Sequence, residues 1–218
     1  MPERKSLIFW IVLIVLIIAG FGIFLLIKRK PQPEQLQPAT TTTTTTTEEN
    51  LSNIDPSEVD SAVKENFNLA KEKAQQWYPD AALVYAQVKL TSLALDEGTE
   101  IYVFDSPSTP NLHFTFTLSQ KSKRYIRAMI PAEDYLGADL LPIDTKYWKL
   151  NYVSALQIAE KEGGRDIREK YLEWTIELNL KRAEPQNWLF WIVDYKTKEG
   201  ETLSIKINPY SGEVVEGT

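Results

Sequence analysis

The segment LHFTFTLS, residues 112–119, alternates strictly between apolar and polar side chains. Phe114 and Phe116 share one face of an extended chain and His113 and Thr115 share the other, because successive side chains of a strand point to opposite sides. This period of two predicts an antiparallel strand with one face on a core and the other in water. In that arrangement His113 is a surface histidine.

Similar strand-like stretches lie on both sides of this segment and are separated by turn-like breaks. In chain order they are residues 83–90, 101–104, 125–130, 172–180, 188–195 and 203–207. Two further stretches have helical spacing. The first is capped by Asp55 and stopped by Pro79, and the second runs from about Tyr152 to the pair Gly163 and Gly164, which is typical of a left-handed helix end. These elements predict an α+β fold.

The two halves of this region have the same order of elements: a helix, a long strand, an aromatic-rich strand, a turn and an alternating strand. Residues 101–104 correspond to residues 188–193, and residues 112–116 to residues 203–207. We therefore expect an internal duplication, in which each unit is an antiparallel sheet with one face covered by its helix. The two units could pack sheet to sheet. The expected boundaries are residues 51–131 for the first unit, 132–149 for a connector and 150–218 for the second unit.

Three short motifs mark the second unit. They are Ala155-x-x-Ile158-Ala159-x-x-x-Gly163-Gly164, Trp188-x-x-Trp191-x-Val193-x-Tyr195 and Ile205-x-Ile207-Asn208-Pro209-Tyr210-Ser211-Gly212-Glu213-Val214. Together they resemble the PepSY domain family over about residues 150–216, and a weaker copy covers residues 57–130. Asn208 stands where the family usually has Asp, and Ser211 where it often has Thr. Both side chains can still bond the backbone, so Asn208, Ser211 and Gly212 are expected to form a structural turn.

The PepSY resemblance implies a small module of peptidase propeptides and envelope proteins, with roles in peptidase inhibition, peptidase regulation or protein binding. Residues 188–193 are apolar on both faces of their predicted strand. One face should meet the helix, and the other should meet the companion unit, a partner or a ligand. The candidate binding face consists of Trp188, Phe190, Trp191 and Tyr195.

A run of 21 residues without a charged side chain, residues 7–27, precedes this region. As a helix it would span roughly 30 Å, the thickness of a bilayer's hydrocarbon core. It is longer than a signal-peptide core and is followed directly by Lys28, Arg29 and Lys30, which favours an uncleaved transmembrane anchor over a signal peptide or a buried helix. Residues 1–30 are therefore expected to form an anchor that contacts lipid through residues 7–27.

Two features of the sequence give opposing indications of which side of the membrane the C-terminal domain occupies. The basic flanks slightly favour a cytoplasmic C-terminal side. Residues 31–50, however, form a Pro- and Thr-rich linker with eight consecutive threonines at residues 40–47, which is typical of exposed, often glycosylated spacers. We expect a single-pass protein of the cell membrane whose C-terminal domain is extracytoplasmic.

The charge of the domain beyond the linker limits its partners. The chain carries −6, of which residues 1–30 contribute +4 and residues 31–50 contribute −3, so residues 51–218 carry −7. An acidic domain is repelled by an anionic bilayer surface and by nucleic acid, so a nucleic-acid partner is not expected. The sequence indicates no oligomeric state.

The usual catalytic motifs are missing. The chain has no cysteine and one histidine, so it lacks a thiol nucleophile and a two-histidine metal site. It also lacks a G-x-S-x-G elbow and a phosphate-binding glycine loop. We therefore expect no catalytic, cofactor-binding or metal-binding residues. Glycosidase chemistry needs only two carboxylates, and it predicts an Asp or Glu pair about 5–10 Å apart in a cleft lined by Trp.

These observations favour a membrane-anchored, extracytoplasmic protein-binding module that is not an enzyme. Its partner would be a peptidase, which it regulates or inhibits, or another envelope protein. The first alternative is a structural spacer or assembly subunit of a cell-envelope complex. A carboxylate-dependent glycosidase acting on the cell wall is the second alternative.

Overall fold

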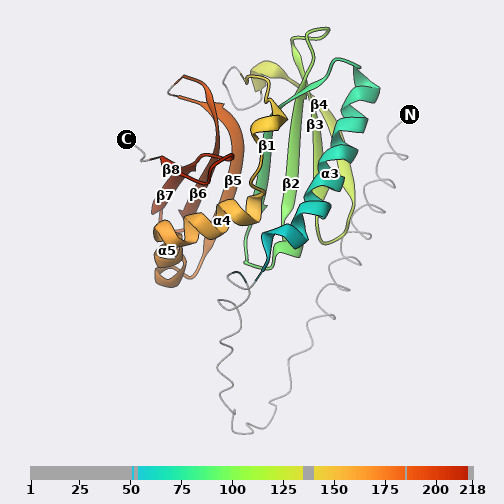
Figure 1. The fold of residues 1–218 in the computed structure, drawn as a ribbon. Coiled ribbons are helices and arrows are strands. Elements are labelled where there is room, and N and C mark those ends of the chain that lie inside the picture. The colour runs from blue at the N-terminus through green and yellow to red at the C-terminus, as the bar shows by residue number, and fades with distance from the viewer. Residues whose placement is uncertain (1–50, 52–53, 135–139, 185, 216–218) are drawn as a thin grey trace, which may run out of the picture. The chain divides into compact units, whose positions relative to one another are not determined.

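The computed structural model describes residues 51, 54–134, 140–184 and 186–215 (Figure 1). The helices are α3 (Pro56–Trp77), α4 (Tyr152–Ala159) and α5 (Arg165–Lys170). The strands are β1 (Ala82–Leu90), β2 (Thr99–Asp105), β3 (Leu112–Ser119), β4 (Tyr125–Pro131), β5 (Trp174–Ala183), β6 (Trp188–Thr197), β7 (Thr202–Ile207) and β8 (Val214–Val215). The α+β expectation is confirmed, and each predicted helix and strand lies within two residues of its expected start.

All eight described strands belong to one antiparallel sheet with the order β4-β3-β2-β1-β5-β6-β7-β8. Two four-stranded halves with the same internal order meet where β1 pairs with β5, with Gln87 opposite Asn179. The halves are therefore joined edge to edge and do not pack sheet to sheet, which was one arrangement that the sequence allowed. This pairing satisfies the backbone groups of two strands that would otherwise be open edges.

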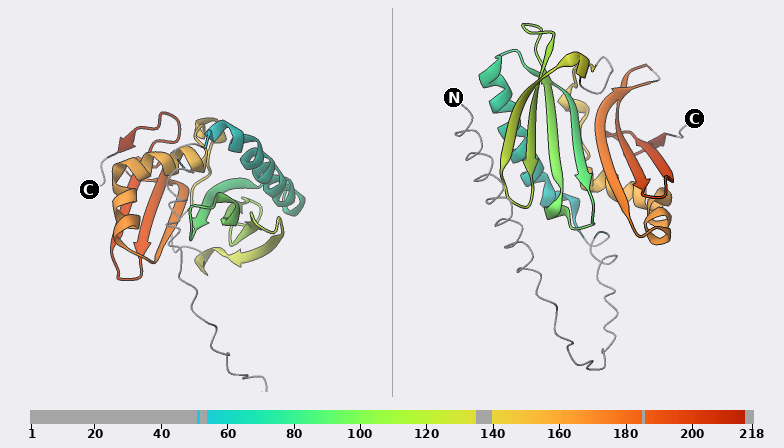
Figure 2. Two further views of the ribbon diagram at one scale, coloured as in Figure 1. Left: turned by 90° about the horizontal axis from the view of Figure 1, so that it is seen from below. Right: turned by 180° about the vertical axis from the view of Figure 1, so that it is seen from behind.

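The helices cover one face of this sheet (Figure 2, left). Helix α3 packs on β2 and β3, and α4 packs on β5 and β6. The side chain of Asp55 accepts a hydrogen bond from the Ser57 backbone N–H at 2.9 Å, which begins α3 as the sequence predicts. Ala70 and Ala74 are fully buried, and their small side chains let α3 approach the sheet closely.

A π-helical turn, Glu160–Gly164, joins α4 to α5 and changes the direction of the chain. Gly163 has a φ of +104°, the left-handed conformation expected at this glycine pair. Gly164 is required for a different reason. A Cβ atom there would lie 2.3 Å from the Tyr195 ring, so only glycine allows this close approach of helix and sheet.

The opposite face of the sheet is not simply solvated. His113 is only 4% exposed, and its Nδ1 atom lies 2.8 Å from Oδ1 of Asp105. The expectation of a surface histidine on a half-solvated strand is therefore wrong. The reason is that this face of the sheet is packed: Asp105 of β2 contacts the imidazole, and the nearby Val103 belongs to a second apolar cluster with Val84 and Tyr85.

The predicted anchor and linker, residues 1–50, lie outside the described residues. None of the described helices has both the length and the apolar character that a membrane span requires.

Candidate functional site

A groove with a volume of about 500 Å³ lies beside the start of β6. Three of the residues that line it are large aromatics, Tyr147, Trp188 and Tyr210, and each is 50–61% exposed. They come from the connector, the start of β6 and the segment after β7. Single exposed aromatics are common on protein surfaces, but three around one hollow make it a candidate binding surface. We call this site the aromatic groove.

Hydrogen bonds fix the walls of the aromatic groove relative to one another. The Arg182 side chain donates from Nε to the Asn187 carbonyl at 2.7 Å and from Nη1 to the Pro142 carbonyl at 3.4 Å. On the other side, the backbone N–H groups of Lys149 and Leu150 donate to the Pro209 carbonyl at 3.0 and 2.8 Å. The connector is thus held to both neighbouring turns, and the groove is preformed.

The β5–β6 turn holds strained backbone beside the groove. Gln186 and Asn187 have φ values of 63° and 55°, in the left-handed region that residues other than glycine adopt infrequently. Such strain persists where the surrounding structure fixes it, and it is concentrated at functional sites. Here it sets the position from which Trp188 projects.

The turn after β7 positions Tyr210. The side chain of Asn208 accepts hydrogen bonds from the backbone N–H groups of Tyr210 and Ser211 at 2.9 and 3.3 Å. Ser211 Oγ accepts from the Glu213 N–H at 3.3 Å, and Gly212 has a φ of +78°. The bonds expected of Asn208, Ser211 and Gly212 are therefore present, and they present Tyr210 to solvent.

The four residues of the predicted binding face do not share one surface. Trp191 and Tyr195 are buried on the helix side, where Trp191 Nε1 donates to the Leu150 carbonyl at 2.9 Å. Phe190 is buried on the other side of β6, with the Lys206 ammonium 5.2 Å from its ring centre. Trp188 alone of the four is exposed, and it lines the aromatic groove.

Sequence reasoning missed Tyr147, Tyr210 and Arg182 as members of this site. The alternation of apolar and polar residues predicts exposure only within strands, and Tyr147 and Tyr210 lie outside them. The site also forms only where three separate segments meet. The one available indication was the position of Tyr210 inside the PepSY-like motif.

In the described part of the chain, the aromatic groove is lined by one charged group of each sign. Its lining contains one carboxylate, Asp144, and one guanidinium, Arg182. A hydrogen bond from the Lys146 side chain, assisted by the Lys146 backbone N–H, lowers the pKa of Asp144, which therefore stays ionised at neutral pH. A groove of this kind suits a ligand with little net charge that offers apolar surface and hydrogen-bonding groups.

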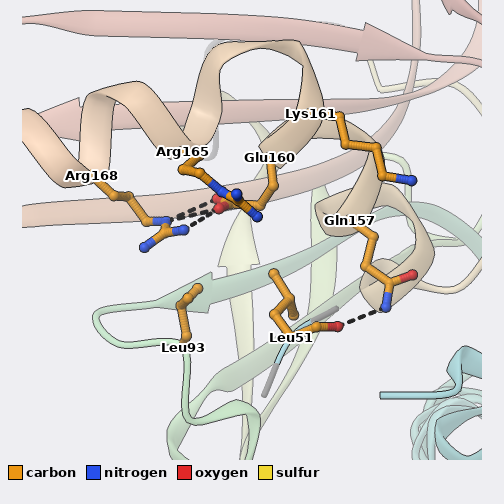
Figure 3. Close-up of a pocket in the computed structure, with 7 residues that line it drawn as sticks. All are labelled: Leu51, Leu93, Gln157, Glu160, Lys161, Arg165 and Arg168. Atoms are coloured by element: carbon orange, nitrogen blue, oxygen red, sulfur yellow. Dashed lines mark hydrogen bonds and ion pairs between the residues drawn. The ribbon is translucent and has the colours of Figure 1, made fainter. Parts of the chain in front are cut away.

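A smaller cavity of about 120 Å³ lies beside α4 and α5 (Figure 3). Three of its polar side chains, Gln157, Glu160 and Arg168, already have partners in the protein. Arg168 forms an ion pair with Glu160, the Tyr195 hydroxyl donates to Glu160 at 2.8 Å, and Gln157 donates to the Leu51 carbonyl at 2.8 Å. Burial raises the pKa of Tyr195, and the Glu160 carboxylate adds to the shift. These bonds indicate a structural role for this cluster.

The clefts lined by Trp do not provide the carboxylate pair that a glycosidase needs. In the aromatic groove Asp144 is the only lining carboxylate among the described residues. A shallow depression beside Trp174 contains Glu173 and Glu177, but four residues along a strand separate positions by roughly 13 Å. Both are also ion-paired, Glu173 with Lys198 at 2.8 Å and Glu177 with Lys196 at 2.6 Å.

No protein-family model, curated protein or solved structure matches this chain. Among the described residues, no group of three His, Asp or Glu side chains could hold a metal ion. The function is therefore inferred from the geometry of the aromatic groove and from the sequence.

Proposed function

We propose that this chain is a membrane-anchored, extracytoplasmic module that binds an extended segment of a partner protein in its aromatic groove. The partner is an envelope protein, such as a peptidase that the module regulates. The observation that carries the proposal is the gathering of Tyr147, Trp188 and Tyr210 around one preformed hollow. Exposed Trp and Tyr side chains give a large contact area at a low entropic cost, which is why they dominate protein-binding sites.

The polar groups of the groove support a peptide ligand. Neither Trp188 Nε1 nor the Tyr210 hydroxyl has a hydrogen-bond partner within the described part of the chain, so both can bond peptide carbonyls. Aromatic-lined grooves with such donors bind extended segments, in which the backbone carbonyls point outward. The volume of about 500 Å³ is sufficient for a few side chains.

A peptide library tests this proposal. Immobilised peptides of about a dozen residues with varied sequence would be incubated with the full-length chain, and the tightest binders would be measured in solution. We expect Trp188→Ala and Tyr210→Ala each to weaken binding by about tenfold or more, the effect of removing a central aromatic anchor. Leu172→Ala is the matched control, because Leu172 is a fully exposed apolar residue outside the groove.

The competing outcomes are distinct. Equal binding by the parent, Trp188→Ala and Leu172→Ala proteins would remove the groove from the binding site. Binding of cell-wall oligosaccharides that Trp188→Ala abolishes, with no peptide binding, would contradict a protein partner.

The proposed location is tested separately. The chain has no cysteine, so Thr43→Cys introduces a single thiol into the linker. We expect a membrane-impermeant maleimide to label this thiol in intact cells. Labelling only after lysis would contradict an extracytoplasmic domain.

A further inference from the structure

The two edges of the sheet differ in length and exposure. One edge is β8, which has two residues, and the other is β4, which has seven (Figure 2, right). Three large apolar side chains of β4, Tyr125, Ile126 and Met129, are 41–72% exposed. Long exposed edges invite pairing with another strand, and proteins usually shorten or cover them. Only the β8 edge follows that rule.

The outward backbone groups of β4 can be assigned from its pairing with β3. The Ser119 N–H donates to the Arg124 carbonyl at 3.0 Å, and the Ala132 N–H donates to the Asn111 carbonyl at 3.0 Å. In an antiparallel ladder every second residue bonds to the neighbouring strand, so the even-numbered residues of β4 face β3. Tyr125, Arg127 and Met129 therefore direct their N–H and C=O groups away from the sheet.

This edge is basic although the domain is acidic. Residues 106–134 contain four basic and two acidic side chains, a net +2, whereas residues 51–218 carry −7, so the rest of the domain carries −9. The two acidic residues, Glu133 and Asp134, follow the C-terminal end of β4. The basic side chains are Lys121, Lys123, Arg124 and Arg127. Lys121 pairs with Glu97 at 2.7 Å, but no carboxylate of the described chain lies within salt-bridge distance of Arg124 or Arg127.

An open groove of about 340 Å³ runs between β4 and the end of α3. It is lined by apolar and basic groups, among them Trp77, Phe114, Met129, Lys73 and Arg127. A strand added beside β4 would direct every second side chain towards this face of the sheet. The groove therefore offers contacts to one set of alternating side chains.

We propose that β4 binds an acidic, extended segment of another protein, which adds to the sheet as a further strand. The backbone groups of Tyr125, Arg127 and Met129 supply the pairing, and the basic side chains select the charge of the segment. A second copy of this chain is a poor occupant, because symmetric antiparallel pairing through these three residues is centred on Arg127 and would place the two Arg127 side chains directly opposite each other. This site differs from the aromatic groove, so either can fail without the other.

A synthetic probe tests strand addition directly. The probe is an N-acetylated, ten-residue peptide of alternating Glu and Val, and binding to the full-length chain is followed by fluorescence polarisation. We expect binding that weakens as salt rises, and about tenfold weaker binding when Lys replaces Glu. Two further probes carry N-methyl groups on all Val or on all Glu residues. Only one of these two probes should bind. In an added strand the N–H groups of alternate residues point towards β4, and those of the residues between them point away.

Variants of β4 complete the test. Met129→Pro removes an outward N–H and leaves the bonds to β3, so it should abolish binding of the Glu-Val probe, with the fold checked by circular dichroism. Arg127→Glu should weaken binding about tenfold, whereas Lys161→Glu, the same charge change at an exposed site elsewhere, should not. Equal binding of both N-methylated probes would overturn the proposal, as would a dimer in sedimentation that Met129→Pro dissociates.

Discussion

The two halves of the sheet share one plan but present different surfaces. Each has four antiparallel strands in sequential order beneath its own helix, and the halves meet at β1 and β5. The first half ends in the long, basic edge β4, whereas the second ends in the short β8 and contributes Trp188 and Tyr210 to the aromatic groove. The same strand arrangement thus carries different exposed surfaces, which fits the view that function resides in sites placed on a fold.

The halves also bury their carboxylates differently. Glu160 in the second half forms an ion pair with Arg168. Glu100 in the first half is also buried, but it accepts hydrogen bonds from the neutral groups of Asn66, Gln120 and Tyr102 at 2.5–2.9 Å. The two sites should therefore respond differently to the same substitution.

The largest expected effect separates these two carboxylates. Glu160→Gln removes the carboxylate that pairs with the buried Arg168 guanidinium, so we expect the free energy of unfolding to fall by about 3–5 kcal/mol. Glu100→Gln replaces one acceptor oxygen with an amide NH2 group, so some of these hydrogen bonds are lost, and we expect a loss of about 1 kcal/mol. Urea unfolding would measure both. Exposed Glu173→Gln is the control, with an expected change of at most about 0.5 kcal/mol, and equal losses at Glu160 and Glu100 would contradict the distinction.

A glycine from each half gives the next comparison. In Gly164→Ala the new Cβ would lie 2.3 Å from the Tyr195 ring, which is held in the core, so we expect a loss of about 3 kcal/mol. In Gly98→Ala the nearest atoms, at 2.7 and 2.9 Å, are the ends of the Gln120 and Leu90 side chains, which can shift, so we expect a loss of about 1 kcal/mol. Thermal unfolding would rank them, and the reverse order would show that the helix kink tolerates a side chain.

Alkaline pH should further distinguish the buried sites around Glu160 and Glu100. Burial raises the pKa of Tyr195 beside Glu160 and of Tyr102 beside Glu100, and burial raises the pKa of Tyr152 to about 12. In the unfolded chain these phenols lose their protons near pH 10, whereas the folded chain retains them. The free energy of unfolding therefore falls as pH rises above about 10.

Melting temperatures between pH 8 and pH 11.5 would measure this loss. We expect the melting temperature to fall less steeply with pH in Tyr195→Phe. It should fall less steeply still in the double substitution Tyr102→Phe and Tyr152→Phe, because two tyrosines with raised pKa values are removed. Slopes that do not change in any variant would show that other groups cause the alkaline loss.

The smallest effect concerns one strained turn from each half. Lys123 and Gln186 have φ values of 53° and 63°, and glycine adopts this region without a steric penalty. We expect Lys123→Gly and Gln186→Gly each to raise the free energy of unfolding by about 0.5 kcal/mol. Gln186→Gly alone should weaken binding of a groove peptide, because it relaxes the turn before Trp188. Equal affinity in both variants would show that this strain does not position Trp188.

The sequence predicted the local elements well because each depends on short-range chemistry. The Asp55 cap, the alternation in β3 and the side-chain bonds of Asn208 and Ser211 all act within a few residues. The repeated order of elements was visible for the same reason. The PepSY resemblance remains a prediction.

The sequence predicted tertiary relations poorly because they depend on which faces and edges meet. Pairing of β1 with β5 could not be read from either half alone, although the nearly continuous apolar run at residues 83–86 is typical of a central strand buried on both faces. Burial of His113 depends on Asp105 of the neighbouring strand. The aromatic groove depends on three separate segments, so Trp188 alone of its three exposed aromatics was selected in advance.

The central claim, that the aromatic groove holds a segment of a partner protein, is tested most directly by photo-crosslinking in native membranes. A benzophenone amino acid would replace Tyr210 in the groove or Leu172 outside it, and adducts would be identified by mass spectrometry. We expect one protein to be crosslinked from position 210 and not from position 172, through a single short segment, with loss of the adduct in Trp188→Ala. The same adducts from both positions, or an adduct that persists in Trp188→Ala, would contradict the account.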